Sequence, residues 1–177
     1  MQPGNYPVWY WIEALRRHYF LIAKCGSQTL RKMAKSAPVD EQEVDEARSF
    51  AVVRDPLSRV VSAYRNKLCF THWPVKIKHA TSTRVPSDED FDATVRQVWG
   101  TPDADLDRHL ASQAYLLSRT KKVGHIVRLE TLPFPRSNAA PDIAVNVSPS
   151  TRAFLLDRFA DDLRIYNAAV SWEDLCD

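Results

Sequence analysis

Short, mainly apolar segments alternate along this chain with longer segments in which apolar residues recur every three or four positions. The apolar segments at residues 19–23 and 49–53 predict two strands, of which the first is fully buried, and residues 124–129 predict a third strand. Residues 8–17 predict a short helix or a cap over the core. The helical period, with capping residues and prolines at the ends, predicts helices at residues 27–35, 57–68, 87–99, 105–118 and 149–169.

Strands that alternate with helices favour a parallel sheet. We therefore predict an α/β fold in which a parallel sheet is flanked by helices. The length of 177 residues favours a single domain over residues 1–177, since one core usually serves roughly 100–200 residues. Residues 69–87 contain two prolines and no clear period, which predicts a long loop of the kind that is often functional.

The charges are distributed unevenly. The first 87 residues carry 14 Lys and Arg against 7 Asp and Glu, whereas the remainder carries 10 against 15. A basic N-terminal half with a pI of about 8.5 suggests an anionic ligand and no nucleic-acid partner. Cys25, Cys69 and Cys176 are sparse and odd in number, which fits a reducing compartment. No apolar run exceeds five residues, so we expect no membrane span and a cytoplasmic protein.

The segment FLIAKCGSQTL, residues 20–30, has the build of an anion-binding turn. A strand leads through Lys24 and small residues into a helix, so several backbone N–H groups and a helix N-terminus point at one spot. Gly26 allows a close backbone approach, and Ser27 and Thr29 offer hydroxyl donors. The alternative is an ordinary strand-to-helix turn with a solvated lysine, and the Walker A pattern GxxxxGK[ST] is absent.

The segment VVRDPLSRVVSAYRNKL, residues 52–68, offers a second pair of anion ligands. Arg54 ends a predicted strand, at the carboxyl edge where open α/β sheets bind ligands. Ser62 lies eight residues later, just over two helical turns, so its hydroxyl can face the same cleft as the guanidinium. In the alternative, Ser62 is a packing residue and Arg59 and Arg65 are solvated.

The order KxGSxTL after a first strand and RDPxxRxxSxYR after a second resembles the sulfotransferase superfamily. The likeness is closest to the carbohydrate (Golgi-type) sulfotransferases and their bacterial relatives, and it spans roughly residues 19–169. Further similar stretches are DRHL at residues 107–110 followed by Gln113, GHIVRLE at residues 124–130, and NVS at residues 146–148.

The resemblance implies a small version of the P-loop-NTPase-like sulfotransferase fold. It also implies transfer of a sulfuryl group from 3′-phosphoadenosine 5′-phosphosulfate (PAPS), a donor co-substrate, to a hydroxyl of a small-molecule or glycan acceptor, without a metal. Arg54 and Ser62 would bind the 3′-phosphate. The residues that would surround the 5′-phosphosulfate are Lys24, Cys25, Gly26, Ser27, Gln28 and Thr29.

The same resemblance covers His109, which we expect to act as the base, because imidazole titrates near neutral pH. Asp105 or Asp107 could orient it, and a partner from across the fold is an equal alternative. Lys24 would stabilise the departing phosphate together with the helix N-terminus.

Other assignments stay open at the level of sequence. Glu13 is the rival base, since some sulfotransferases use a glutamate, and His72 and His79 rank third, as acceptor contacts in the segment 69–87. Zinc is not expected, because Cys69 and the two loop histidines are irregularly spaced and lack a fourth ligand. The alternative functions are a non-catalytic nucleotide-binding relative and, less favoured, a kinase-like enzyme that uses ATP and magnesium.

Overall fold

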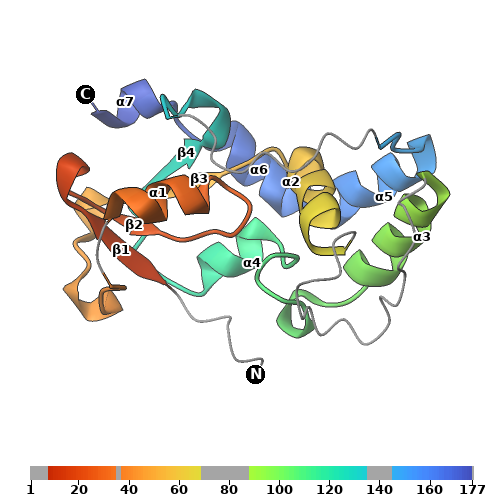
Figure 1. The fold of residues 1–177 in the computed structure, drawn as a ribbon, viewed down its shortest axis with the longest axis horizontal. Coiled ribbons are helices and arrows are strands. Elements are labelled where there is room, and N and C mark those ends of the chain that lie inside the picture. Colours follow the sequence, from red (N-terminus) through yellow and green to blue (C-terminus); the bar gives the residue numbers. More distant parts are fainter. Residues whose placement is uncertain (1–7, 35–36, 69–87, 135–144, 177) are drawn as a thin grey trace.

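The computed structural model describes residues 8–34, 37–68, 88–134 and 145–176 of the chain (Figure 1). Its sheet has the strand order β1-β2-β3-β4, in which β1 is antiparallel to β2 and the other two pairings are parallel. The α/β class is therefore confirmed, with an antiparallel strand added at one edge of the parallel sheet. The strands are β1 (Trp9–Ile12), β2 (Arg17–Phe20), β3 (Ser49–Val53) and β4 (His125–Arg128).

Helices surround this sheet. In Figure 1, α1 crosses in front of the strands, whereas α2, α3 and α5 form the part of the molecule away from the sheet. None of the helices in the described ranges is long and apolar enough to span a membrane. The α-helices are α1 (Ser27–Ala34), α2 (Pro56–Ala63), α3 (Asp88–Trp99), α4 (Gln113–Ser118), α5 (Pro149–Arg158), α6 (Ala160–Ala168) and α7 (Trp172–Cys176). A π-helical segment, Tyr64–Leu68, continues α2, and 3-10 turns lie at Glu13–Leu15, Glu41–Glu43, Glu46–Arg48, Asp103–Asp105 and Leu129–Thr131.

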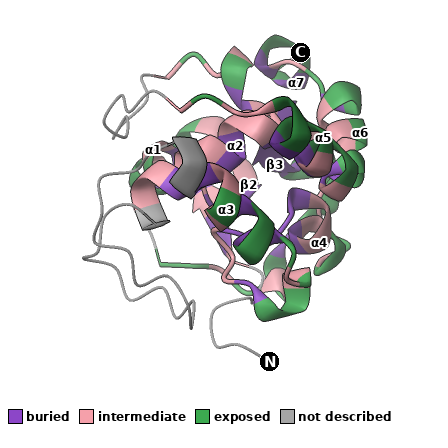
Figure 2. Cartoon of the chain, turned by 90° about the vertical axis from the view of Figure 1, so that its right-hand side faces the viewer, coloured by how far each residue is buried: buried purple, intermediate pink, exposed green. Residues whose placement is uncertain are grey.

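The core is built around β3, whose five residues are all buried. Figure 2 shows the buried residues near β2 and β3 and the exposed ones on the outer faces of the helices. Each fully buried large apolar side chain contributes about 1.5–3 kcal/mol relative to an exposed one. The predicted strand at residues 49–53 is confirmed at both ends, because an uninterrupted apolar run of this length fits a strand covered on both faces.

Of the two interpretations of residues 8–17, a short helix or a cap over the core, the helix is wrong. The segment forms β1, a 3-10 turn and the start of β2, which pair as a hairpin with Tyr10 opposite Tyr19. Aromatic residues favour strands, and Arg16, at a φ of 51°, supplies the left-handed residue that closes the turn. Here the cross-strand packing of aromatic rings, such as Trp9 on Phe20 with centroids 5.0 Å apart, decides the conformation.

Other predicted elements differ in their boundaries. β2 ends at Phe20, so residues 21–23 are apolar because they are packed in the turn and not because they continue the strand. The helix predicted at residues 105–118 begins only at Gln113, since Ser112 has extended backbone angles and its Oγ accepts a hydrogen bond from the N–H of Tyr115. The predicted helix at residues 149–169 is broken at Phe159, which leaves helical geometry while its side chain is buried.

The C-terminal segment closes the β4 edge of the sheet. Val170 forms a parallel bridge with Val127, and its N–H donates to the carbonyl of Ile126 at 2.9 Å. Trp172 then packs edge-on against Phe50 and Phe134, with ring centroids 5.8 and 5.3 Å apart. This contact fastens α7 to the central strand.

Replacing this anchor, Trp172→Ala, should lower the free energy of unfolding by about 3–5 kcal/mol, the usual cost of deleting a buried aromatic side chain. Urea denaturation followed by circular dichroism measures the change. The matched control, Leu156→Ala on the exposed face of α5, should stay within about 0.5 kcal/mol of the wild type. Equal midpoints for both variants would contradict the assigned role of Trp172.

Candidate functional site at the carboxyl edge of the sheet

The turn from β2 to α1 carries the first group of predicted ligands. It runs from Leu21 to Gly26, and the carbonyl of Gly26 accepts the hydrogen bond from the N–H of Leu30 that opens the helix. Lys24 and Gly26 both have left-handed backbone angles, with φ of 70° and 73°. These two reversals fold the chain into a tight loop directly before the N-terminus of α1, the geometry that collects backbone N–H groups at one place.

Gly26 has two reasons to be glycine. A side chain would be strained at its positive φ, and an added Cβ would lie 2.8 Å from Cδ1 of Leu129. Lys24 carries the same backbone strain without this freedom, so the surrounding structure must hold it in place.

Arg54 follows β3 directly, at the same edge of the sheet as this loop, because β2 and β3 are parallel and Phe20 pairs with Ala51. Asp55 then caps α2, accepting a hydrogen bond from the N–H of Ser58 at 2.8 Å, and Pro56 takes the first helical position. Ser62 lies half-buried in the last turn of α2. The structure thus brings the first loop and Arg54 together at one edge, with Ser62 on the helix that leaves it.

One buried amide links the first loop (residues 21–26) to the second loop, residues 54–55 between β3 and α2. Oε1 of Gln113 accepts hydrogen bonds from Sγ of Cys25 at 3.1 Å and from the N–H of Arg54 at 2.9 Å. Nε2 of Gln113 donates to the carbonyl of Arg54 at 2.9 Å. The first and second loops are therefore neighbours in space, as their sequence order along a parallel sheet predicts.

A buried arginine adds a second link. Arg59 on α2 is 2% exposed, and it donates from Nε to the carbonyl of Ala23 at 3.2 Å. Its terminal nitrogens donate to the carbonyls of Ala111 at 2.8 Å and Arg108 at 3.4 Å. Arg59 thus binds the first loop and the turn before α4 at once, and the view that it is a solvated residue is wrong.

Asp162 on α6 balances this charge from the other side. It is 1% exposed and accepts hydrogen bonds from the N–H groups of Gln113 at 2.9 Å and Ala114 at 2.8 Å, so it caps α4. Burial raises its pKa above the ordinary value, even though these hydrogen bonds and the charge of Arg59 act in the opposite direction. Burial likewise raises the pKa of the Cys25 thiol to about 11, so at neutral pH the thiol keeps the proton that it donates to Gln113.

His109 lies in the turn that precedes α4, next to one of the carbonyls that Arg59 binds. Its Nδ1 is 2.5 Å from Oδ1 of Asp107, and its N–H donates to the same oxygen at 2.8 Å. Burial acts to raise the pKa of Asp107, but the two hydrogen bonds from His109 outweigh it and the pKa is lowered. A carboxylate at Nδ1 leaves Nε2 as the ring atom that can accept a proton.

The turn that carries His109 is held by bonds to distant helices. Nε1 of Trp99 donates to the carbonyl of Leu110 at 2.8 Å. Asp103 accepts from the N–H and Oγ of Ser112 at 2.8 and 2.6 Å, and pairs with Arg158 of α5 at 2.8 Å. The position of His109 is therefore set by α3 and α5 as well as by its own segment.

The rival base is placed elsewhere. Glu13 lies exposed in the 3-10 turn between β1 and β2, where it accepts a hydrogen bond from Nε1 of Trp11 at 2.6 Å. This turn is at the amino end of β2, whereas the first loop follows its carboxyl end. His72, His79 and the rest of the segment 69–87 lie outside the described residues.

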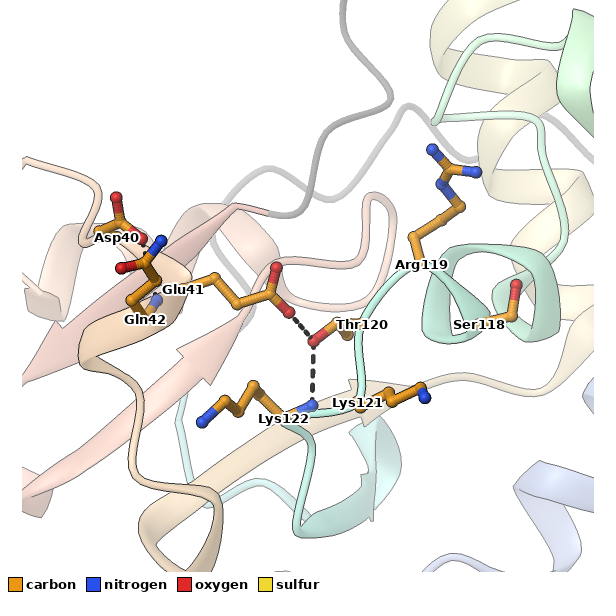
Figure 3. A pocket seen from close by; sticks show the side chains of 8 residues that line it. All are labelled: Asp40, Glu41, Gln42, Ser118, Arg119, Thr120, Lys121 and Lys122. Atoms are coloured by element: carbon orange, nitrogen blue, oxygen red, sulfur yellow. Dashed lines mark hydrogen bonds between the residues drawn. The ribbon is translucent and has the colours of Figure 1, made fainter.

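A shallow hollow of about 530 Å³ lies at the amino ends of the strands, opposite the two loops (Figure 3). Thr120 in its wall hydrogen-bonds to Glu41 and accepts the N–H of Lys122. Oγ of Ser49, the first residue of β3, donates to the carbonyl of Lys122, which places the hollow at the amino end of that strand. It is therefore separate from the loops that follow the strands. The residues that line it are Asp40, Glu41, Gln42, Ser118, Arg119, Thr120, Lys121 and Lys122.

Within the described ranges, no group of three or more His, Cys, Asp or Glu side chains is arranged to hold a metal ion.

The fold and these loops define an α/β protein with a tight strand-to-helix turn and an arginine at the carboxyl edge of neighbouring parallel strands. Residues 16–138 match the Sulfotransferase family, and the chain belongs to this family. The matched range includes both loops, α2, His109 and β4. No curated protein and no solved structure matches the chain.

Replacing the buried arginine, Arg59→Met, should destabilise the protein by about 3–5 kcal/mol, because three carbonyls lose their donor and Asp162 loses a nearby cation. Thermal or urea unfolding measures the loss. Arg152→Met, at an exposed position of α5, is the matched control and should change stability by less than about 0.5 kcal/mol. A tolerated Arg59→Met would mean that the guanidinium is dispensable at this edge.

Proposed function

We propose that this member of the Sulfotransferase family uses PAPS as its donor and transfers the sulfuryl group to a hydroxyl of a carbohydrate acceptor. The supporting observation is the convergence of the two loops at one edge of the sheet, joined through Gln113. A ligand with a phosphate at each end of an adenosine needs two anion sites at a fixed spacing. The pair of loops supplies candidate groups for both.

In this proposal the first loop holds the 5′-phosphosulfate. Lys24 brings a positive charge, and the N-terminus of α1 brings the N–H groups of its first turn and the positive end of the helix dipole. The other proposed contacts of this end are Cys25, Gly26, Ser27, Gln28 and Thr29. Cys25 contributes through its backbone, since its side chain is fully buried and bonded to Gln113.

Arg54 and Ser62 are proposed to bind the 3′-phosphate. A guanidinium and a hydroxyl suit a phosphate, because both donate hydrogen bonds and the first adds charge. The positive potential at this edge already acts on a neighbouring group: the charges of Arg59 and Arg54 oppose the burial that raises the pKa of Cys25.

The reaction is an in-line displacement at sulfur. The acceptor oxygen forms a bond to sulfur while the bond from sulfur to the 5′-phosphate oxygen breaks, and 3′-phosphoadenosine 5′-phosphate leaves. Charge gathers on the leaving phosphate, and in this proposal Lys24 and the N-terminus of α1 stabilise it. Nε2 of His109 takes the proton of the acceptor hydroxyl, and Asp107 fixes the ring and stabilises the imidazolium that forms.

Donor binding is the first test. Calorimetry should detect binding of 3′-phosphoadenosine 5′-phosphate to the wild type, and Arg54→Ala should weaken it by about 1.5–3 kcal/mol, the value of a charged hydrogen bond. Arg48→Ala, exposed before the amino end of β3, is the control and should bind like the wild type. Absence of binding to the wild type at millimolar ligand refutes the proposal. A larger thermal shift with ATP and Mg²⁺ than with this ligand would favour the kinase-like alternative.

The base is tested by His109→Ala. Turnover of PAPS over a panel of carbohydrate acceptors should fall at least about a hundredfold, in the range that a general base contributes. The affinity for 3′-phosphoadenosine 5′-phosphate should change less than about twofold, because the imidazole is assigned to the acceptor and not to the donor. His125→Ala, on the exposed start of β4, should leave both quantities unchanged. Unaltered turnover in His109→Ala would remove it as the base, and binding without any turnover in the wild type would favour the non-catalytic alternative.

A further inference from the structure

The side chain of Gln113 uses its whole hydrogen-bonding capacity inside the protein. It is 0% exposed at the first position of α4. Its oxygen accepts from Cys25 and from the N–H of Arg54, and its nitrogen donates to the carbonyl of Arg54 and to Oδ2 of Asp162 at 3.4 Å. Three segments that are far apart in the sequence therefore meet at one planar group.

The two bonds to Arg54 have the form of a strand pairing. An N–H donates to Oε1 at 2.9 Å and a carbonyl accepts from Nε2 at 2.9 Å, so the amide extends the hydrogen bonding of β3 past its last residue, Val53. Only a group with a donor and an acceptor side by side can make this pair. A carboxylate lacks the donor, and an apolar side chain lacks both.

The amide is itself held in place. The carboxylate of Asp162 accepts from the backbone N–H of Gln113 at 2.9 Å and from that of Ala114 at 2.8 Å, which fixes the first turn of α4. Through Gln113, Cys25 and Arg54 are therefore connected to a buried residue of α6 and not to a flexible surface residue. A network with every member satisfied is rigid in this way.

From this geometry we infer that Gln113 is a positioning residue that holds the two phosphate loops at a fixed separation and couples binding at one to binding at the other. The inference rests on the proposed function, since it assumes that each loop receives one phosphate of the donor. A ligand that bridges both loops gains from a spacing that is set in advance, whereas a ligand with one phosphate does not.

The test compares three ligands by calorimetry: 3′-phosphoadenosine 5′-phosphate, adenosine 3′-monophosphate and adenosine 5′-monophosphate. Gln113→Leu should weaken the bisphosphate about 5- to 150-fold, the range of coupling between linked sites, and each monophosphate by less than about threefold. Gln97→Leu, exposed on α3, is the matched control and should leave all three affinities unchanged. An equal loss for all three ligands, or none, would overturn the inference.

A second variant gives a readout that general destabilisation does not produce. In Gln113→Glu, the protonated carboxyl group can donate to the carbonyl of Arg54 as Nε2 does. The ionised form has no donor, so it is repelled by that carbonyl and by the Asp162 carboxylate. Burial and Asp162 favour the protonated form, whereas the charges of Arg54 and Arg59 favour the ionised one; the Cys25 thiol is neutral. The ratio of variant to wild-type affinity for the bisphosphate should therefore approach one as the pH falls from 7.5 to 5.5.

Taking the ratio at each pH cancels the titration of the phosphates on the ligand. A ratio that does not change with pH, or a Gln113→Glu variant that fails to fold at every pH, would overturn the inference, because the amide would then serve only the fold. Failure of the proposed function gives a different result, namely a folded wild type that binds no bisphosphate.

Discussion

The structure at the carboxyl ends of β2 and β3 depends on satisfying the hydrogen bonds of one buried guanidinium, that of Arg59. Arginine does not lose its proton, so a buried arginine must find hydrogen-bond acceptors for a permanent charge. Here the acceptors are the carbonyls of Ala23, Arg108 and Ala111, which belong to the first loop and to the turn before α4. If either segment moved, part of the guanidinium would lose its hydrogen-bond acceptors. Helix α2 is the rigid element from which the Arg59 side chain reaches both segments. A tight loop that includes a strained lysine at φ 70° needs such an external support.

The same arrangement has an electrostatic consequence. Arg59 uses its donors on carbonyls, which carry no net charge, and the anion that compensates it, Asp162, is bonded to the start of α4. The electrostatic potential beside the first loop is therefore positive. It acts to lower the pKa of the Cys25 thiol, whereas burial raises that pKa. Lys24 and the N-terminus of α1 add to this field from the chain itself. The proposed transfer from a phosphosulfate would require such a preorganised positive field beside the leaving group.

Local signals in the sequence predicted the parts of this edge that are determined locally. The uninterrupted apolar run of β3, the small residues before α1 and the proline at the start of α2 each specify their own conformation. The remainder follows from contacts between distant segments. β1 is a strand because its aromatic rings pack across the hairpin, and the helix after His109 starts late because Ser112 is held by Asp103. The burial of Arg59 and the bonds of Gln113 depend on elements more than 30 residues away, so periodicity within one segment does not reveal them. The motif RDPxxR contains Arg59, but no structural role was predicted for that residue from the sequence; its place one turn into α2 is the signal from which its burial could have been inferred.

The shift of His109 from a helix to a turn changes how a base is positioned in this fold. On a helix its place would be set by the backbone of that helix alone. In the turn, its ring is aligned by Asp107, two residues earlier, while the neighbouring carbonyls are held by Trp99 and Arg59. The pair between Asp103 and Arg158 connects the same turn to α5. The proposed base and the proposed donor loops therefore share one support, because Arg59 binds both segments. If the proposed roles hold, substitutions in α3 or α5 should alter the alignment of the proposed base with the proposed donor, although neither helix supplies a ligand to them.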